Sequence, residues 1–273
     1  MNTPQITFVG AGNMACSVIG GLVKQGYQPD SLCASARTAA RLDALVSRFG
    51  IRVQQDNTAA VRDADVVVLA VKPQVIKDVC LEVRPHLCPS ALVISVAAGI
   101  RCASLSQWLG AERHLVRCMP NTPAQVQMGA SGLFAAEGVT ADEKATAERI
   151  LAAVGTVAWV DDEELLHAVT AVSGSGPAYF FLFLEAMTQA AVQQGLDPVT
   201  ARQLAVQTAA GAARLAQTDD ADLAELRRRV TSPGGTTERA IAAFEQHHLR
   251  QTVDIAMQAC ANRSRELAEL LGR

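Results

Sequence analysis

The chain has 273 residues, with 24 Lys or Arg against 27 Asp or Glu and a formal net charge of −3. Its pI near 6.0 argues against the broad basic surface that binds a nucleic-acid backbone, so no nucleic-acid partner is expected. The length favours two domains.

The composition predicts a soluble protein kept inside the cell. No run of about 18 uncharged apolar residues is present, so no membrane partner is expected. The N-terminal stretch MNTPQITFVG has no basic segment before its short apolar run, which indicates an unexported, cytoplasmic protein. Scattered cysteines in odd number and without a CxxC pair favour reduced, buried thiols over disulfides or zinc, and no metal is expected. They are Cys16, Cys33, Cys80, Cys88, Cys102, Cys118 and Cys260.

Residues 1–161 alternate short β-branched runs with helical patterns, which is typical of βαβ units on a parallel sheet. The run VVVLAV is apolar on both faces, as in a central strand covered by helices on each side. The expected strands are 6–10, 31–35, 51–54, 65–71, 91–96 and 114–119, with 131–136 and 156–160 extending the sheet.

Residues 162–273 contain only Ala-, Leu-, Gln- and Glu-rich segments with helical periodicity, interrupted at GSGP, GLDP and SPGG. We expect these residues to form an all-helical second domain. Its segment Ala178–Gln194 is apolar over most of its circumference at the start. Such a helix lies either at the centre of a bundle or in a subunit interface. Because so small a domain supports only a modest core, we expect an intertwined homodimer.

The stretch GAGNMA, Gly10 to Ala15, follows the first expected strand and opens a helix. That context is what distinguishes a dinucleotide-binding turn from a chance glycine-rich one. Gly10 makes the tight turn, Gly12 lets the backbone approach a pyrophosphate, and Ala15 permits close packing of helix on strand. The amides at the helix start, with Asn13 and Met14, then face the phosphates. The first domain is therefore expected to be a Rossmann-type, doubly wound α/β sheet.

The end of the second strand selects between the two nicotinamide dinucleotides. An NAD enzyme usually has Asp or Glu there, whereas a 2′-phosphate needs hydroxyls and a cation. This chain has Ser35, Arg37 and Thr38, and no acid before Asp43. We therefore expect NADP, with NADPH preferred and NADH possible. The alternative is that Arg37 is a solvated residue of the first helical turn.

Two later strand ends have the small or helix-starting residues expected of a ligand crevice. Pro73 stands at an expected first helical turn in AVKPQ, after Ala70, Val71 and Lys72. The next strand ends in Ala97, Ala98 and Gly99. Ligands bind outside the carboxyl ends of parallel strands in such sheets, and small side chains there leave room for a nicotinamide ring.

The stretch TSPGGTTE, Thr231 to Glu238, lies between two expected helices. Taken alone it is a helix-loop-helix connection, since its residues are those of turns and helix caps. Glycines also let a backbone approach a small ligand closely, and hydroxyls can bind it. The segment leaves both interpretations open.

Seven motifs in one order over about residues 6–267 make the chain resemble the pyrroline-5-carboxylate reductases. They are GAGNMA, ASART, AVKP, VAAGI, MPNTPA, SGSGPAY and TSPGGTTE. The resemblance implies reduction of the cyclic imine of pyrroline-5-carboxylate to L-proline by NAD(P)H. It also implies a helical dimerisation domain and further assembly of dimers, a decamer by resemblance. One departure is the run Arg227 to Arg229, which puts in doubt a nicotinamide contact from position 229.

The resemblance also assigns site residues. Thr237 is expected at the reacting group, with its hydroxyl on the ring nitrogen. Backbone amides around Gly234, Gly235 and Thr236 are expected to hold the carboxylate at a helix start. Ser173, Thr231 and Ser232 complete the expected substrate site, and Asn57 and Asn121 join the expected cofactor site.

The expected reaction needs no strong acid or base from the protein. An iminium already carries its proton, unlike a ketone, whose developing alkoxide needs a donor. The enzyme is expected to act by positioning the rings and excluding water.

Three other interpretations remain. A two-domain hydroxyacid dehydrogenase would place a catalytic lysine on the interdomain helix, but the four lysines, Lys24, Lys72, Lys77 and Lys144, all precede the helical domain. A dinucleotide sensor would bind NADPH without turnover and would need no second hydroxyl-rich loop. His167, His247 and His248 suggest a metal or proton relay, although lone histidines on helices are usually surface or capping residues.

Overall fold

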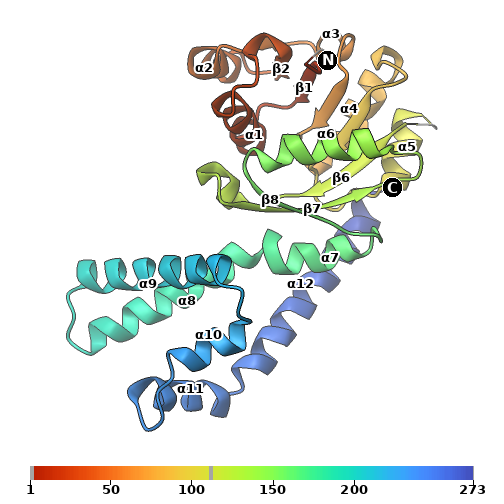
Figure 1. Cartoon of the computed structure of the whole chain (residues 1–273). Helices are drawn as coiled ribbons and strands as arrows, with labels where there is room; N and C mark the ends of the chain where they lie inside the picture. The colour runs from red at the N-terminus through yellow and green to blue at the C-terminus, as the bar shows by residue number, and fades with distance from the viewer. Residues whose placement is uncertain (1–2, 111–112, 273) are drawn as a thin grey trace. The chain divides into compact units, whose positions relative to one another are not determined.

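The structure is a computed structural model that describes residues 3–110 and 113–272. Its strands form one eight-stranded sheet in the order β3-β2-β1-β4-β5-β6-β7-β8 (Figure 1). The strands β1 to β6 are parallel, β7 is antiparallel to β6, and β8 is parallel to β7. Their bounds are β1 Ile6–Val9, β2 Leu32–Ser35, β3 Arg52–Gln54, β4 Val66–Leu69, β5 Leu92–Ser95, β6 Leu115–Met119, β7 Gly129–Ala135 and β8 Gly155–Trp159. All the strands expected from the sequence are present, with small shifts at their ends.

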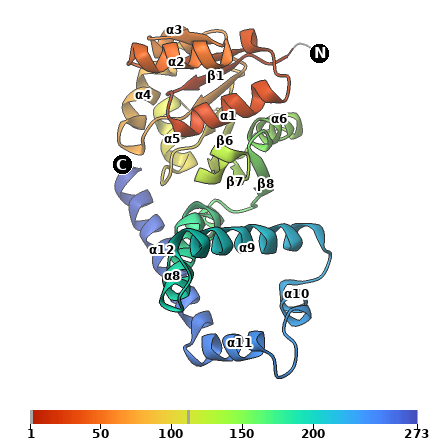
Figure 2. The same cartoon turned by 90° about the vertical axis from the view of Figure 1, so that its left-hand side faces the viewer.

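Helices cover both faces of the sheet, so the expected doubly wound α/β fold is confirmed (Figures 1 and 2). In β4, Val66 and Val68 pack into the core beneath α1, α2 and α6, whereas Val67 and Leu69 pack beneath α3, α4 and α5. Alternate residues of a strand point to opposite faces, which explains why this strand is apolar throughout. The helix bounds are α1 Asn13–Lys24, α2 Ala39–Phe49, α3 Asn57–Val61, α4 Ile76–Val83, α5 Cys102–Leu109 and α6 Ala141–Ala152.

The chain divides into two compact units, Met1–Ser175 with Cys260–Arg273, and Gly176–Ala259. The expected boundary at 161/162 marks the change from strands to helices, but packing places the division later. Helix α7 (Leu165–Val169) lies on β7, where a Cβ on Gly132 would stand 2.5 Å from Val169 Cγ1. The end of α12 (Leu249–Leu271) is tied to α5 by a 2.8 Å hydrogen bond from Ser104 Oγ to the Gly272 carbonyl. Both segments therefore belong to the sheet unit.

Every described residue after 160 is helical or lies in a connecting segment, which confirms the expected all-helical second part. Helices α8 (Gly176–Gln193) and α9 (Pro198–Thr218) lie side by side, and α10 (Leu223–Arg229) and α11 (Thr236–Gln246) follow (Figures 1 and 2). The GLDP interruption ends one helix and starts the next, because the Asp197 carboxylate accepts from the amides of Val199 and Thr200.

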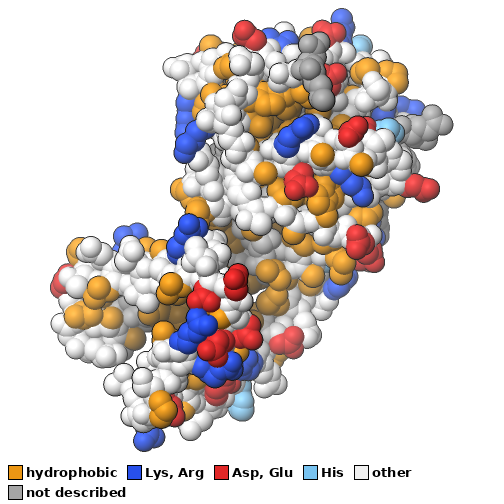
Figure 3. Space-filling model, in the orientation of Figure 1, with side chains coloured by type: hydrophobic (Ala, Val, Ile, Leu, Met, Phe, Trp, Pro, Cys, Tyr) orange, Lys and Arg blue, Asp and Glu red, His pale blue; other side chains and the backbone are white. Residues whose placement is uncertain are grey.

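The helical unit has almost no core of its own. Among its hydrophobic side chains, all of which the structure describes, only Ala201 and Ala205 are buried. On α8, Phe180, Phe181 and Leu182 are 68%, 67% and 68% exposed, and Figure 3 shows hydrophobic side chains open on the surface of this unit. So large an exposed apolar area marks a contact surface.

Candidate functional site

The glycine-rich turn joins β1 to α1 as the sequence predicts. Gly10 has φ +105°, and a Cβ there would lie 2.7 Å from the Ala70 carbonyl oxygen. Only glycine fits such a conformation and so close an approach of backbone to backbone. Gly12 is the N-cap of α1, and no side chain caps that helix start. The first amides of α1 are therefore left to bind an anion.

A cleft of about 580 Å³ opens over this turn. The structure brings together there six residues of the expected cofactor site: Gly12, Asn13, Met14, Ala70, Val71 and Lys72. The cleft is also lined by three residues of α2 that were not expected there, Arg41, Arg48 and Phe49. The sequence contains a signal for the two arginines, because Arg41 and Arg48 are seven residues apart and so share one face of a helix.

The end of β2 differs in detail from the expected 2′-phosphate site. Ser35 is fully buried, and its hydroxyl donates a 2.7 Å hydrogen bond to Oδ1 of Asn57. The amide of Asn57 in turn donates to the Glu82 carboxylate at 3.3 Å. Arg37 is exposed and does not line the cleft. The expected hydroxyl donor is thus committed to Asn57, because a serine hydroxyl has a single proton.

The small residues after β5 have a packing role as well as an expected role at the cofactor. Ala97 is 5% exposed. Gly99 has φ +75°, and its Cβ position lies 3.6 Å from the Ala268 amide nitrogen of α12. Ala98 is exposed. After β4, Pro73 opens a short 3₁₀ turn, Pro73–Val75, that leads into α4.

Asn121 joins three segments of the sheet unit. Its Nδ2 donates to the Ser173 carbonyl at 3.0 Å, and its Oδ1 accepts from the Ala130 amide at 2.9 Å. Ser173 lies in a π-helical turn, Thr170–Gly174, between α7 and α8, and its hydroxyl donates to the Val169 carbonyl. Such turns are rare and are often found at functional sites. The GSGP interruption predicted from the sequence is therefore a change of helix type.

The TSPGGTTE loop leads into α11, which begins at Thr236 as expected. Both glycine amides of this loop have hydrogen-bond acceptors within the structure. The Gly234 amide donates to Oε2 of Glu238 at 2.7 Å, and the Gly235 amide donates to the Ser232 carbonyl at 3.0 Å. A substrate carboxylate at these amides would therefore replace an internal acceptor, and the carboxylate site at this loop stays a prediction.

The hydroxyls of this loop differ in their bonding. Thr231 donates to the Arg227 carbonyl at 2.6 Å. Within the described chain, no hydrogen bond is recorded for the side chains of Ser232, Thr236 or Thr237. These hydroxyls remain available to a ligand.

Two of the arginines that precede this loop, Arg228 and Arg229, are paired within the helical unit. Arg229 donates to the Asp219 carboxylate at 2.7 Å and to Glu225 at 3.3 Å, and Arg228 pairs with Glu225. Their charges are therefore balanced locally in this structure.

The histidines were considered as a metal or proton relay. The described residues contain no group of three metal-binding side chains. His167 is 2% exposed and hydrogen-bonded through Nδ1 to Ser264 Oγ at 2.8 Å. Burial lowers the pKa of His167, and the nearby Glu164 opposes part of that shift.

Comparison with known proteins identifies the family. Residues 163–267 match the family described as pyrroline-5-carboxylate reductase dimerisation. Residues 5–99 match the family described as NADP oxidoreductase, coenzyme F420-dependent. A pyrroline-5-carboxylate reductase of Pseudomonas aeruginosa is 52% identical over 273 residues, covering 100% of both chains. This chain belongs to the pyrroline-5-carboxylate reductase family.

Other members agree across the whole chain. A pyrroline-5-carboxylate reductase of Pisum sativum is 39% identical and covers 96% of this chain and 95% of its own. The structure of a pyrroline-5-carboxylate reductase from Coxiella burnetii has 47% identity and a TM-score of 0.95, covering 97% and 99% of the two chains. One from Plasmodium falciparum, with NADP bound, has 26% identity and a TM-score of 0.85, covering 98% and 99%.

The family match bears on the exposed helix α8. The segment Leu165–Gln193 is long and apolar enough to cross a membrane by length and composition alone, and only 22% of its most apolar window is buried. The same segment lies within the match to the reductase dimerisation domain. A single chain of a dimer exposes the surface that its partner covers, so the apolar face of α8 fits dimerisation.

Proposed function

We propose that this chain reduces the C=N bond of 1-pyrroline-5-carboxylate to give L-proline, with NADPH as preferred hydride donor and NADH as a weaker alternative. The observation that carries the proposal is the cleft over the glycine-rich turn, in a chain that belongs to this reductase family. NADPH is preferred because Arg37 follows β2 where an NAD enzyme usually has an acid.

The residues of the cleft fit a nicotinamide dinucleotide. The absent side chain of Gly10 lets the backbone turn close to Ala70, and the uncapped start of α1 offers amides to a pyrophosphate. Lys72 adds a cation from the β4 side of the cleft. When bound, the dinucleotide supplies the hydride. The proposed cofactor site also includes Ser35, Arg37, Asn57, Pro73, residues 97–99 and Asn121.

The substrate is proposed to bind at the TSPGGTTE loop, with Thr231 and Ser232 of that loop. Ser173 is a further substrate residue proposed by resemblance. The substrate carboxylate takes the place of the Glu238 carboxylate at the Gly234 amide, and the amides at the start of α11 add further donors. The Thr237 hydroxyl, which has no recorded partner in the described chain, binds the ring nitrogen. The internal contact with Glu238 supports this assignment, since the acceptor at the Gly234 amide is already a carboxylate oxygen.

This arrangement accounts for a reaction without a general acid. The hydride is delivered to the carbon of a protonated imine, and the electron pair of the C=N bond moves to nitrogen, which becomes the neutral ring amine. Thr237 orients the nitrogen, and the loop amides hold the carboxylate. The protein therefore lowers the barrier mainly by alignment and by excluding water.

The protein is proposed to work as a cytoplasmic homodimer that assembles further, to a decamer by resemblance. The near absence of a core in the helical unit supports the dimer, because Ala201 and Ala205 alone leave most of its apolar side chains exposed. The finer assembly is measured by sedimentation velocity of the full-length protein.

The test is a spectrophotometric assay of NADPH oxidation with 1-pyrroline-5-carboxylate, run beside NADH. We expect turnover with both cofactors and a higher kcat/KM with NADPH. Binding of NADPH without any turnover of the imine would instead identify a dinucleotide sensor. A higher kcat/KM with NADH would overturn the assigned preference.

A further inference from the structure

Helix α2 presents two arginines to the cofactor cleft. Arg41 and Arg48 are seven residues apart, about two helical turns, and both line the cleft with Asn13 and Lys72. Arg48 also lines an adjoining polar cavity of about 450 Å³ that includes Asn13 and Lys24. One face of α2 therefore presents two cationic side chains to the cleft that also contains the start of α1.

Among the described residues, the charges of Arg41 and Arg48 have no acidic partner. None of the described residues that line the two cavities is acidic. No ion pair is recorded for Arg41 or Arg48 in residues 3–110 and 113–272. The Arg48 guanidinium lies over the Phe49 ring, 4.8 Å from its centroid, which holds the side chain without neutralising it. Unpaired arginines that line a cleft raise the local concentration of anions.

The two arginines also face α1. Burial raises the pKa of the Cys16 thiol on α1, while the Arg48 and Arg41 guanidiniums oppose part of that shift. Both cations therefore act on the helix whose amides are expected to meet the pyrophosphate.

We propose that Arg41 and Arg48 are phosphate-binding residues of the dinucleotide site, and that Arg41 discriminates NADPH from NADH. This proposal rests on the proposed function, which supplies the ligand. Arg41 lies in the first turn of α2, directly after the β2 end at which the 2′-phosphate is expected, and it joins Arg37 there. Arg48 shares both cavities with Asn13 of the glycine-rich turn and binds the pyrophosphate. The Ser35 hydroxyl proton is committed to Asn57, so the 2′-phosphate needs other donors, and Arg41 is one of them.

The experiment measures dissociation constants of NADPH and NADH for the full-length protein by titration calorimetry, without the imine substrate. Arg41→Ala is expected to weaken NADPH binding about tenfold and to change NADH binding less than about twofold, the size of one lost charge-assisted contact. Arg48→Ala is expected to weaken both about tenfold. Arg→Lys variants at both positions should recover part of the loss, since a lysine keeps the charge without the planar fork.

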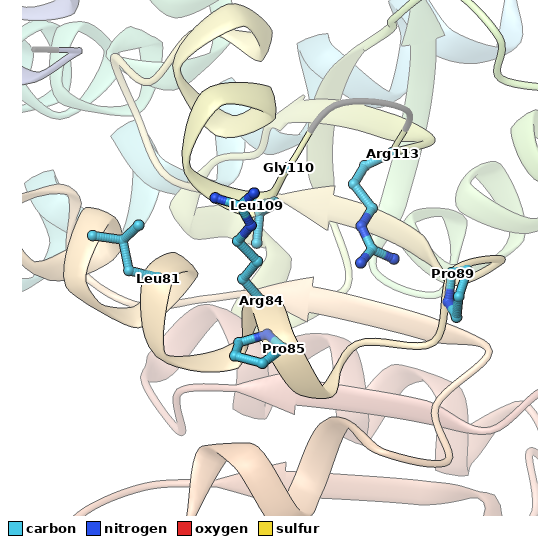
Figure 4. Close-up of a pocket in the computed structure, with 7 residues that line it drawn as sticks. All are labelled: Leu81, Arg84, Pro85, Pro89, Leu109, Gly110 and Arg113. Carbon is cyan, nitrogen blue, oxygen red and sulfur yellow. The ribbon is translucent and has the colours of Figure 1, made fainter.

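The matched control is Arg84→Ala. Arg84 and Arg113 line a separate cavity of about 610 Å³ with Leu81, Pro85 and Leu109 (Figure 4). This cavity borders the segments that lead into the amino ends of β5 and β6, whereas the cofactor cleft lies at the carboxyl ends of the strands. Both dissociation constants should be unchanged in this variant.

Unchanged affinities in Arg41→Ala and Arg48→Ala would overturn the proposal, and equal losses of NADPH and NADH in Arg41→Ala would overturn the discriminating role. Thermal melting of each variant identifies losses of affinity that come from unfolding. If an Arg→Ala variant unfolds, the dissociation constants of the Arg→Lys variant at the same position supply the test. Because the titration needs no turnover, a protein that binds both dinucleotides but leaves pyrroline-5-carboxylate unreduced would contradict the proposed function and leave this assignment standing.

Discussion

The hydroxyl of Ser35, the last residue of β2, donates a 2.7 Å hydrogen bond to Oδ1 of Asn57, the first residue of α3. Asn57 then donates to Glu82 of α4, so one chain of hydrogen bonds ties the strand end to two helices. The Ser35 hydroxyl can accept a further bond but cannot donate one. The proposed 2′-phosphate site at this strand end therefore needs hydrogen-bond donors other than the Ser35 hydroxyl.

Arg37→Ala is expected to raise the KM for NADPH and to leave NADH kinetics nearly unchanged. The lost charge-assisted bonds contribute about 1.5–3 kcal/mol, and only to the cofactor with a 2′-phosphate. Steady-state kinetics with each cofactor in turn make the measurement, with NADH as the internal control. Equal losses with both cofactors would refute the role of Arg37.

Thr237→Val, which is nearly isosteric, is expected to lower kcat/KM by one to two powers of ten, since one positioned hydrogen bond near developing charge contributes about 1–3 kcal/mol. Melting temperature and NADPH affinity should change little. Thr200→Val is the matched control, because Thr200 also lies in the first turn of a helix, α9, but outside the proposed site. If Thr237 only caps α11, its variant will lose thermal stability and keep normal kinetics.

Gly10→Ala is expected to destabilise the protein much more than Gly26→Ala. Both glycines have positive φ, +105° and +88°, so both variants carry the backbone strain of about 1–2 kcal/mol. Only at Gly10 does the new Cβ collide with the Ala70 carbonyl, whereas nothing lies within 4 Å of the Cβ position at Gly26. Melting curves of the two variants measure the difference. Equal shifts in melting temperature would show that the turn relaxes freely.

Phe181→Glu is expected to dissociate or unfold the dimer, because a charge buried in an interface without a partner costs about 3–5 kcal/mol. Phe181 is 67% exposed in the single chain. Leu81→Glu is the control, since Leu81 is also exposed but lies on α4 of the sheet unit. Sedimentation velocity measures the assembly. A Phe181→Glu protein that sediments like wild type would place the interface elsewhere.

His167 is expected to make stability fall in acid. Burial lowers its pKa below the ordinary 6.5, so the unfolded chain binds the proton more tightly than the folded one. The contribution of neutral His167 to the free energy of unfolding is therefore constant above about pH 6.5. It is lost as the pH falls through that value towards the pKa of His167 in the folded state. Melting temperatures between pH 5 and 8 test this, with His167→Asn as the comparison. Parallel pH profiles for the two proteins would exclude His167 as the cause.

The positions of the strands along the chain, the glycine-rich turn and the helical second half were predictable because each depends on neighbours along the chain. The apolar run of β4 needs two covered faces, and Gly10 needs a conformation that other residues disfavour, whatever packs around them. The start of α11 at Thr236 follows equally from local turn chemistry. The recurring motifs added the family, and the comparisons confirm it.

The interactions that differ from the sequence-based expectation at the site join segments that are far apart in the sequence. The pairing of Ser35 with Asn57 and the placing of Arg41 and Arg48 along the cleft require the packing of α2 and α3 around the sheet. The division of the chain after Ser175 depends on α7 and the end of α12 lying against that sheet. Glu238 reaches the Gly234 amide across one helical turn, but which acceptor that amide uses depends on the folded loop. Periodicity specifies which face of an element is apolar, and only the folded chain specifies what that face meets.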